Sequence, residues 1–282
     1  MKLFLYSYLL VIIIPANAQE WCKKNKPARL DKRLHTWDNK LISDRFSHSV
    51  TPDVVKYGYT QIETAVIFRN EILVNDEWVK DPADYSLNVY NSLMLKHSFG
   101  QRTEYQVNYM DVMISGDDPV RRFARNDVNT PVSVGVKYNL YNSGYNPVKL
   151  SLYGQLTLPK PKFMLNSFMS PEIRLLFSHM LLRNISITGN IGAAYSNSLQ
   201  NMTILYAVNP KLYIGEWFEL FTEFYKSFTK TGPPRLPCKR GLLGFGFYFR
   251  DDIYFYSSFE AGWYNEDSLN SERFDCGLTC RF

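Results

Sequence analysis

The chain has 282 residues, including 20 Tyr and 19 Phe, and carries a formal net charge of +5. This length permits one large domain or two ordinary ones, and the aromatic content excludes a disordered chain. The small net charge and the lack of a basic stripe exclude a protein that coats nucleic acid.

The chain begins with a predicted signal peptide, residues 1–18. Lys2 gives a short basic start, residues 3–14 are apolar, and the small residues 16–18 precede the predicted cleavage site. The apolar run is shorter than the ~20 residues that a membrane-spanning helix needs. We therefore expect a cleaved leader and an exported protein rather than a helical anchor.

Residues 19–55 form a second region, which is largely polar and carries no strand pattern. We predict a periplasmic segment here that enters or covers the mouth of the domain that follows, with Asp44 and Arg45 contacting charges inside it. The rival interpretation is a loose periplasmic tail.

Residues 56–282 read as one domain built of strands with alternating apolar and polar side chains, because successive strand residues point to opposite faces. In the run 131–141, for example, Val132, Val134 and Val136 oppose Ser133 and Lys137. Twelve strands are predicted, at 57–70, 85–99, 102–114, 131–141, 147–158, 171–181, 184–195, 203–214, 217–227, 239–249, 253–264 and 273–282.

The connections between these strands alternate in length along the chain. The predicted long connections are 71–84, 115–130, 159–170, 196–202, 228–238 and 265–272, and the short ones are 100–101, 141–146, 182–183, 215–216 and 250–252. Tight turns on one side and long loops on the other are typical of a bacterial outer-membrane barrel. We therefore predict an all-β fold, a transmembrane up-and-down antiparallel β-barrel of about 12 strands, with its tight turns in the periplasm.

Alternation alone does not separate a membrane barrel from a soluble one, and the charges within the strands decide the prediction. In a dry core each would need a buried partner, whereas in a watered lumen they cost little. The predicted lumen-lining residues are Glu63, Glu104, Lys137, Lys149, Tyr153, Arg174, Glu219, Glu223, Tyr225, Tyr254, Tyr256, Glu260 and Arg273. Aromatic residues on the apolar rows near strand ends, where membrane girdles lie, are Tyr138, Tyr195, Phe218, Phe249 and Trp263.

The chain ends on a strand whose apolar row includes Phe274 and Phe282. An aromatic terminal strand of this kind resembles the signal by which the barrel-assembly machinery recognises its substrates, and the strand must also pair with the first one to close the ring. The same row carries Cys276 and Cys280, which are too far apart along a strand to bridge. Cys22 and Cys238 lie outside the strand patterns, and both a disulfide and free thiols remain open for them.

Several stretches resemble a family of outer-membrane transporters catalogued under "MetA-pathway of phenol degradation". The family opens with Asp-Arg-Pro and then Gly-x-x-Gln-Ile-Glu-Thr-Gly; this chain has Asp44-Arg45-Phe46 and Gln61-Ile62-Glu63-Thr64-Ala65. Further matches are Gly-x-Lys-Tyr-x-Leu at 135–140 and the Leu-Pro strand end at 158–159. The resemblance implies a transporter or channel, and phenol does not follow from it.

We therefore expect an outer-membrane channel for small solutes, with membrane lipids, the assembly machinery and the solute as its partners. Hydrophobic or aromatic compounds are candidate solutes, because lumenal tyrosines could form a slide for flat molecules. The alternative is a structural or adhesive barrel, in which the same charges and tyrosines pair and fill a plugged lumen.

Catalysis is not expected. A membrane-embedded lipase would need a Ser–His pair, and in the candidate His97-Ser98 the two side chains point to opposite faces of a strand. No Cys/His spacing indicates a metal site, and no glycine-rich phosphate loop indicates a nucleotide cofactor.

Overall fold

A computed structural model describes residues 41, 43–44, 49–72, 85–114, 132–142, 148–158, 169–182, 184–196, 201–229, 239–265 and 268–282. The predicted leader, Arg45, Cys22 and Cys238 lie outside these residues. Within them, no helix has the length and apolar character needed to cross a membrane.

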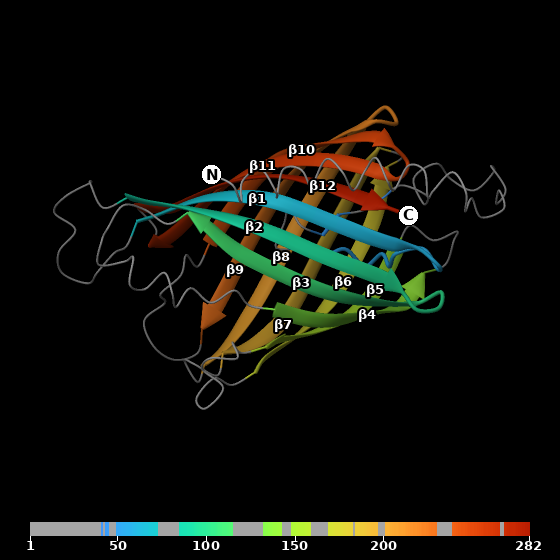
Figure 1. The fold of residues 1–282 in the computed structure, drawn as a ribbon, viewed down its shortest axis with the longest axis horizontal. Coiled ribbons are helices and arrows are strands. Elements are labelled where there is room, and N and C mark those ends of the chain that lie inside the picture. The colour runs from blue at the N-terminus through green and yellow to red at the C-terminus, as the bar shows by residue number, and fades with distance from the viewer. Residues whose placement is uncertain are drawn as a thin grey trace. The chain divides into compact units, whose positions relative to one another are not determined.

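Twelve antiparallel strands close into one barrel, in which each strand pairs with its neighbours in the sequence (Figure 1). This confirms the predicted fold class. The strands are β1 (Thr60–Ile72), β2 (Tyr85–Ser98), β3 (Thr103–Ile114), β4 (Val132–Asn142), β5 (Val148–Leu158), β6 (Ser170–Leu182), β7 (Ile185–Ser196), β8 (Asn201–Ile214), β9 (Phe218–Thr229), β10 (Lys239–Arg250), β11 (Ile253–Asn265) and β12 (Ser268–Arg281).

The first and last strands close the ring. β1 pairs with β12 in a continuous register from Gln61 opposite Arg281 to Glu71 opposite Ser271. This pairing leaves no sheet edge with open N–H and C=O groups, so the backbone of every strand is satisfied within the ring.

The two faces of each strand differ as the alternation predicts. On β4, the outward Val134, Val136 and Tyr138 are 38 to 44 % exposed, whereas the inward Lys137 and Asn139 are 0 and 3 % exposed. The same alternation recurs around the ring, so the barrel presents an apolar outer wall and a largely polar inner wall.

One predicted connection is wrong. The sequence predicts a long loop at 265–272, but β11 continues to Asn265 and β12 starts at Ser268. The run is largely polar, yet the backbone groups of polar residues pair as well as those of apolar ones, here with register shifts around Trp263. The β7–β8 connection is also short, at 197–200. Only some of the connections on the side predicted to carry long loops are therefore long.

Aromatic side chains gather on the outer wall at the tight-turn end of the barrel. Trp217 and Phe249 are 59 and 68 % exposed. Ring centroids of Trp217 and Phe247 lie 5.9 Å apart, and those of Phe218 and Phe247 lie 4.8 Å apart. Such a cluster suits the boundary between hydrocarbon and water, where aromatic girdles occur.

On the inner wall, tyrosine rings lie against glycines of the neighbouring strand. A Cβ at Gly277 of β12 would lie 2.5 Å from the Tyr256 ring and 2.6 Å from the carbonyl oxygen of Thr64. A Cβ at Gly246 of β10 would lie 2.5 Å from the Tyr254 ring. Glycine at these two positions therefore lets each ring lie flat on the wall.

We expect Gly277→Ala to destabilise the barrel by about 1–3 kcal/mol, the usual range for overpacking, because the clash involves backbone at the closing seam. Gly154→Ala on β5 is the matched control, since no heavy atom lies within 4 Å of an added Cβ there. Urea unfolding, followed by heat-modifiable migration on gels, measures the difference. Equal midpoints for the two variants would contradict this packing.

Candidate functional site

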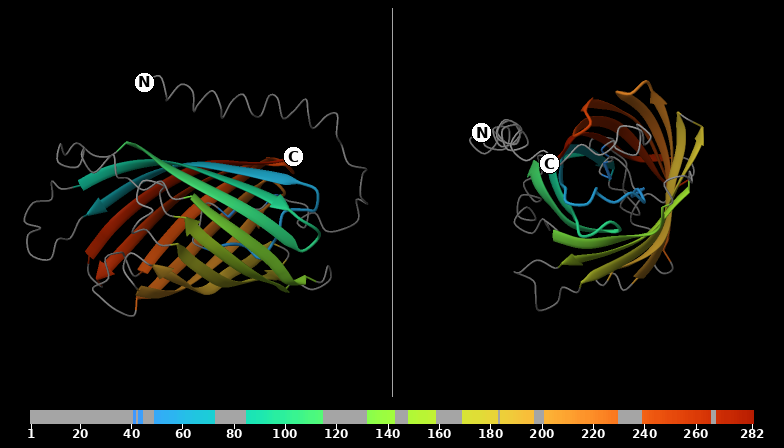
Figure 2. Two further views of the ribbon diagram at one scale, coloured as in Figure 1. Left: turned by 60° about the horizontal axis from the view of Figure 1, so that its bottom comes forward. Right: turned by 90° about the vertical axis from the view of Figure 1, so that its right-hand side faces the viewer.

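The lumen holds part of the N-terminal segment. The described residues of 41–55 lie within the ring of strands in the end-on view (Figure 2, right), and Leu41, Asp44 and Val55 are 0, 6 and 6 % exposed. A tight turn follows, in which Tyr59 N–H donates to the Lys56 carbonyl over 3.0 Å and Gly58 adopts a φ of 80°. That left-handed conformation suits glycine and redirects the chain into β1.

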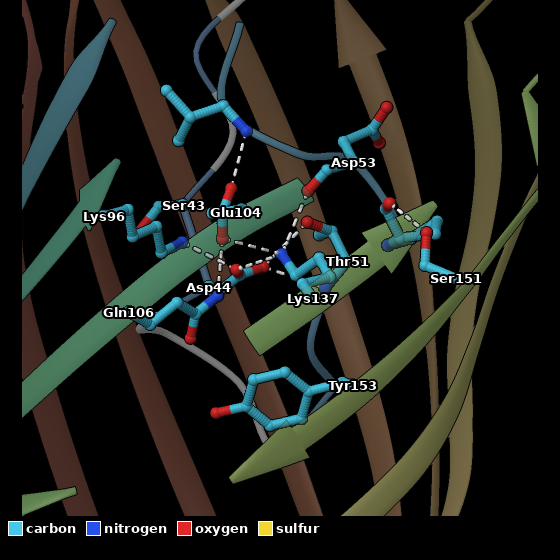
Figure 3. Close-up of polar contacts among 12 residues, drawn as sticks. Ser43, Asp44, Thr51, Asp53, Lys96, Glu104, Gln106, Lys137, Ser151 and Tyr153 are labelled. Atoms are coloured by element: carbon cyan, nitrogen blue, oxygen red, sulfur yellow. Dashed lines mark hydrogen bonds and ion pairs between the residues drawn. The ribbon is translucent and has the colours of Figure 1, made fainter. Parts of the chain in front are cut away.

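Asp44 lies at the centre of a buried ionic cluster (Figure 3). Its Oδ2 is 2.6 Å from Lys96 Nζ on β2 and 2.9 Å from Lys137 Nζ on β4. The wall supplies further carboxylates, since Glu63 of β1 contacts Lys96 and Glu104 of β3 lies 3.3 Å from Lys137. Side chains from four strands therefore form the cluster, and two of them, Lys96 and Lys137, contact the Asp44 carboxylate directly.

The wall carboxylates accept hydrogen bonds from the segment. Ser43 Oγ donates to Glu63 over 2.9 Å, and the Asp44 N–H donates to the same carboxylate over 3.2 Å. The Val55 N–H donates to Glu104 over 2.5 Å. These charge-assisted bonds fix the backbone of the segment as well as its side chains.

A second set of contacts joins the segment to β5 and β9. Lys149 Nζ lies 2.6 Å from Asp53 Oδ1, and Ser151 Oγ donates to the Pro52 carbonyl over 2.5 Å. On the other side of the lumen, Ser49 N–H donates to Glu223 over 2.9 Å. The segment is thus bonded to both β1–β5 and β9.

An apolar cluster holds the start of the segment. Leu41 packs with Ala65 and Ile67 of β1, Phe221 of β9, Leu242 of β10, and Tyr254 and Tyr256 of β11. Buried aliphatic and aromatic area of this kind stabilises the contact independently of charge. The segment therefore meets an ionic sector on β1–β5 and, at Leu41, an apolar cluster formed by residues of β1 and β9–β11.

The ionised form of Asp44 is favoured. Burial would raise the pKa of this carboxyl, but the Lys137 and Lys96 ammonium groups and the bonds from Lys96 and Thr51 hold that pKa below its ordinary value. The segment therefore presents a carboxylate to the two lysines.

The remaining predicted lumen residues pair along the inner wall. Glu219 accepts from Tyr254 over 2.5 Å and from Tyr248 over 3.0 Å. Glu260 lies 2.9 Å from Arg240 and 3.7 Å from Arg273, and Arg174 pairs with Glu172. Tyr153 donates to Gln155.

Every predicted lumen residue lies on an inward-facing row, but only some of these residues bind the segment. Glu63, Glu104, Lys137, Lys149 and Glu223 bind the segment. Tyr153, Tyr254 and Tyr256 are 3, 1 and 0 % exposed while the segment lies in the lumen, and Leu41 packs with the last two.

Sequence reasoning missed Lys96, Asp53, Phe221 and Leu242. Lys96 lies on the inward-facing row of β2, so the alternation of inward and outward residues predicts it as a lumen residue. Phe221 and Leu242 lie on the inward-facing rows of β9 and β10. Those rows are expected to be polar, so the alternation does not indicate an apolar side chain there as a lumen residue.

The two halves of the lipase candidate lie on opposite faces of β2. His97 Nδ1 is 3.0 Å from Thr60 Oγ1 on the outer face, whereas Ser98 Oγ donates inward to the Lys56 carbonyl over 2.8 Å. Among the described residues, no group of three His, Cys, Asp or Glu side chains could hold a metal ion.

Phe274 lies on the outer wall of β12, 44 % exposed, with its ring centroid 6.1 Å from that of Phe68 on β1. Cys276 on the same strand is a free thiol, and Cys280 follows it four residues later. Phe282 directly follows β12, which ends at Arg281.

No family model and no curated protein matches the sequence. The fold is similar to that of solved outer-membrane barrels. The NanC porin has a TM-score of 0.54 at 6 % identity, covering 78 % of this chain and 98 % of its own. An outer-membrane channel from Pseudomonas putida F1 has a TM-score of 0.53 at 8 % identity, covering 86 % and 100 %. The KdgM porin in complex with disordered oligogalacturonate has a TM-score of 0.51 at 9 % identity, covering 77 % and 99 %. At these identities the likeness is one of fold.

We expect Asp44→Asn to release the segment, because Lys96 and Lys137 then lose the carboxylate of the segment and keep only their wall partners Glu63 and Glu104. Val54→Cys, a half-buried position in the segment, reports release through faster labelling by a charged maleimide added to detergent-solubilised protein. Asp251→Asn in the exposed β10–β11 turn is the matched control. Unchanged labelling in the Asp44 variant would contradict the role of the ion pairs.

The lowered pKa of Asp44 predicts how docking depends on pH. Because the carboxylate form is the one that docks, its contribution is complete above the ordinary pKa of about 3.9 and is lost as the pH falls through the lower folded-state pKa. A nitroxide at position 54 should therefore stay immobile down to about pH 4 by electron paramagnetic resonance. Release on going from neutral pH to pH 5 would contradict the assignment.

Proposed function

We propose that this chain is an outer-membrane channel for small solutes whose lumen is closed by the segment 41–55. The observation that carries the proposal is the pairing of an apolar outer wall with an inner wall rich in charge. An outer row such as Val134, Val136 and Tyr138 suits acyl chains, and an inner row with Lys137 and Asn139 suits water. The likeness in fold to porins supports the same conclusion.

The segment supports a closed state rather than an open pore. Its bonds reach β1 to β5 and β9, so it crosses the path that a solute would take. Its attachments are mostly ion pairs and hydrogen bonds, which water and other ions can replace when the segment moves. We therefore assign residues 19–55 a plug role and residues 56–282 the barrel.

The location and partners follow from the same proposal. We place the barrel in the outer membrane after export by the leader, with lipids around its outer wall. Phe274 and Phe282 are assigned to recognition by the assembly machinery. The aromatic class of solute, and membership of the phenol-degradation family, rest on the sequence resemblance.

A second candidate function is a structural or adhesive barrel that never opens. The fixed contacts of the segment at Asp44, Asp53 and Ser49 favour it, because a permanently sealed lumen needs such bonds. The two candidates differ in whether displacing the segment yields a conducting pore.

Removal of residues 19–55, with the leader retained, tests the difference. The twelve strands pair with one another, so we expect the barrel to fold and to give larger single-channel currents in planar bilayers than the intact protein. Heat-modifiable migration on gels checks that the barrel is folded.

Liposome swelling with sugars, amino acids and aromatic acids then reports what crosses. A folded deletion variant that conducts no more than the intact chain would favour the sealed structural barrel.

A further inference from the structure

We propose that the wall site occupied by Asp44, Asp53 and their neighbours binds a small hydroxylated carboxylate, such as a sugar acid, when the segment leaves. The inference rests on the proposed channel function and names the chemical class of its solute. The segment acts as a stand-in whose carboxylates, hydroxyl and N–H groups mark where a ligand would bind (Figure 3).

Three lysines of the wall bind the carboxylates of the segment. Lys96 and Lys137 both contact one oxygen of the Asp44 carboxylate, at 2.6 and 2.9 Å, and their side chains are 1 and 0 % exposed. Lys149 binds the Asp53 carboxylate at 2.6 Å. Three cations on β2, β4 and β5 thus form a site already shaped for carboxylates.

The wall carboxylates accept hydrogen bonds from the segment. Glu63 accepts from the Ser43 hydroxyl and the Asp44 N–H, and Glu104 accepts from the Val55 N–H. Buried carboxylates need such donors, because an unpaired one costs free energy. A ligand that replaces the segment must bring hydroxyl or N–H groups as well as a carboxylate.

The site is built for an anion. The wall contributes three lysines and two glutamates, a formal excess of one positive charge, and the segment brings the two carboxylates of Asp44 and Asp53 to it. A ligand that carries a carboxylate replaces what the lysines lose when the segment leaves, whereas a neutral polyol leaves the lysines in excess.

The tyrosines that would suit a flat aromatic solute meet a different part of the segment. Tyr254 and Tyr256 pack with Leu41, and their rings lie against Gly246 and Gly277. The carboxylates of Asp44 and Asp53 instead meet lysines of β2, β4 and β5, so the site that the segment marks there is one for a carboxylate.

The test uses the full mature chain with Asp44→Asn and Asp53→Asn, which loosens the segment but keeps every wall residue. Gluconate is the probe. Sorbitol carries its hydroxyls without the carboxylate, and propionate carries a carboxylate without the hydroxyls. We expect gluconate to interrupt single-channel current at a concentration about tenfold lower than either control, the effect of losing one or two charge-assisted bonds.

Lys137→Gln in the same background should raise the blocking concentration of gluconate about tenfold, while Lys211→Gln on the inner wall of β8 should not. Lys149→Gln, whose side chain is 20 % exposed, serves if the Lys137 variant fails to fold. Equal block by gluconate, sorbitol and propionate, or no response to either substitution, would overturn the inference and leave the channel function standing.

Calorimetric titration of the detergent-solubilised double variant with gluconate gives a second readout that needs no current. If no variant conducts, the proposed channel function fails, and the calorimetry still decides this inference. Gluconate heat that disappears in the Lys137→Gln variant supports the site, and its absence in the parent background refutes it.

Discussion

Closure of the strand ladder is the constraint on which the rest of the structure depends. Because β12 pairs with β1 over the whole register from Gln61 to Glu71, no strand edge remains open. Each strand must then divide its residues strictly between an outer and an inner wall. The apolar outer wall, the charged lumen and the site for the segment all follow from that division, and a shift of one residue in any strand would exchange the walls.

The ion pairs of the lumen fix the position of the segment more than they stabilise the fold. Moving charges out of water costs free energy that the attraction between them roughly offsets, so a buried pair adds modest stability, yet removing one partner is costly. Asp44 between Lys96 and Lys137 therefore sets where the segment lies. Leu41 in its apolar cluster supplies attraction that charge does not. A segment held in this way has one defined position and can still be displaced.

Local periodicity explains how much of the fold could be predicted. The strands and their inward-facing rows follow from the alternation of apolar and polar residues, which the sequence alone displays, as in β4. The largely polar run at 265–272 lacks that alternation, so the sequence does not indicate that its backbone continues β11 and begins β12. The contacts of Asp44, Ser49 and Asp53 join residues up to 174 positions apart, and no local pattern encodes which wall residue each one meets. The resemblance around Asp44 pointed to the segment without giving those partners.

The central claim is that the outer wall meets acyl chains while the inner wall meets water. Site-directed spin labelling along β4 in lipid bilayers tests it most directly, with oxygen and a water-soluble nickel complex as the two relaxants. Labels at Val134, Val136 and Tyr138 should be reached by oxygen and shielded from nickel, whereas labels at Ser133 and Asn139 should be shielded from oxygen. Nickel access at the outward positions, or no alternation along the strand, would contradict the account.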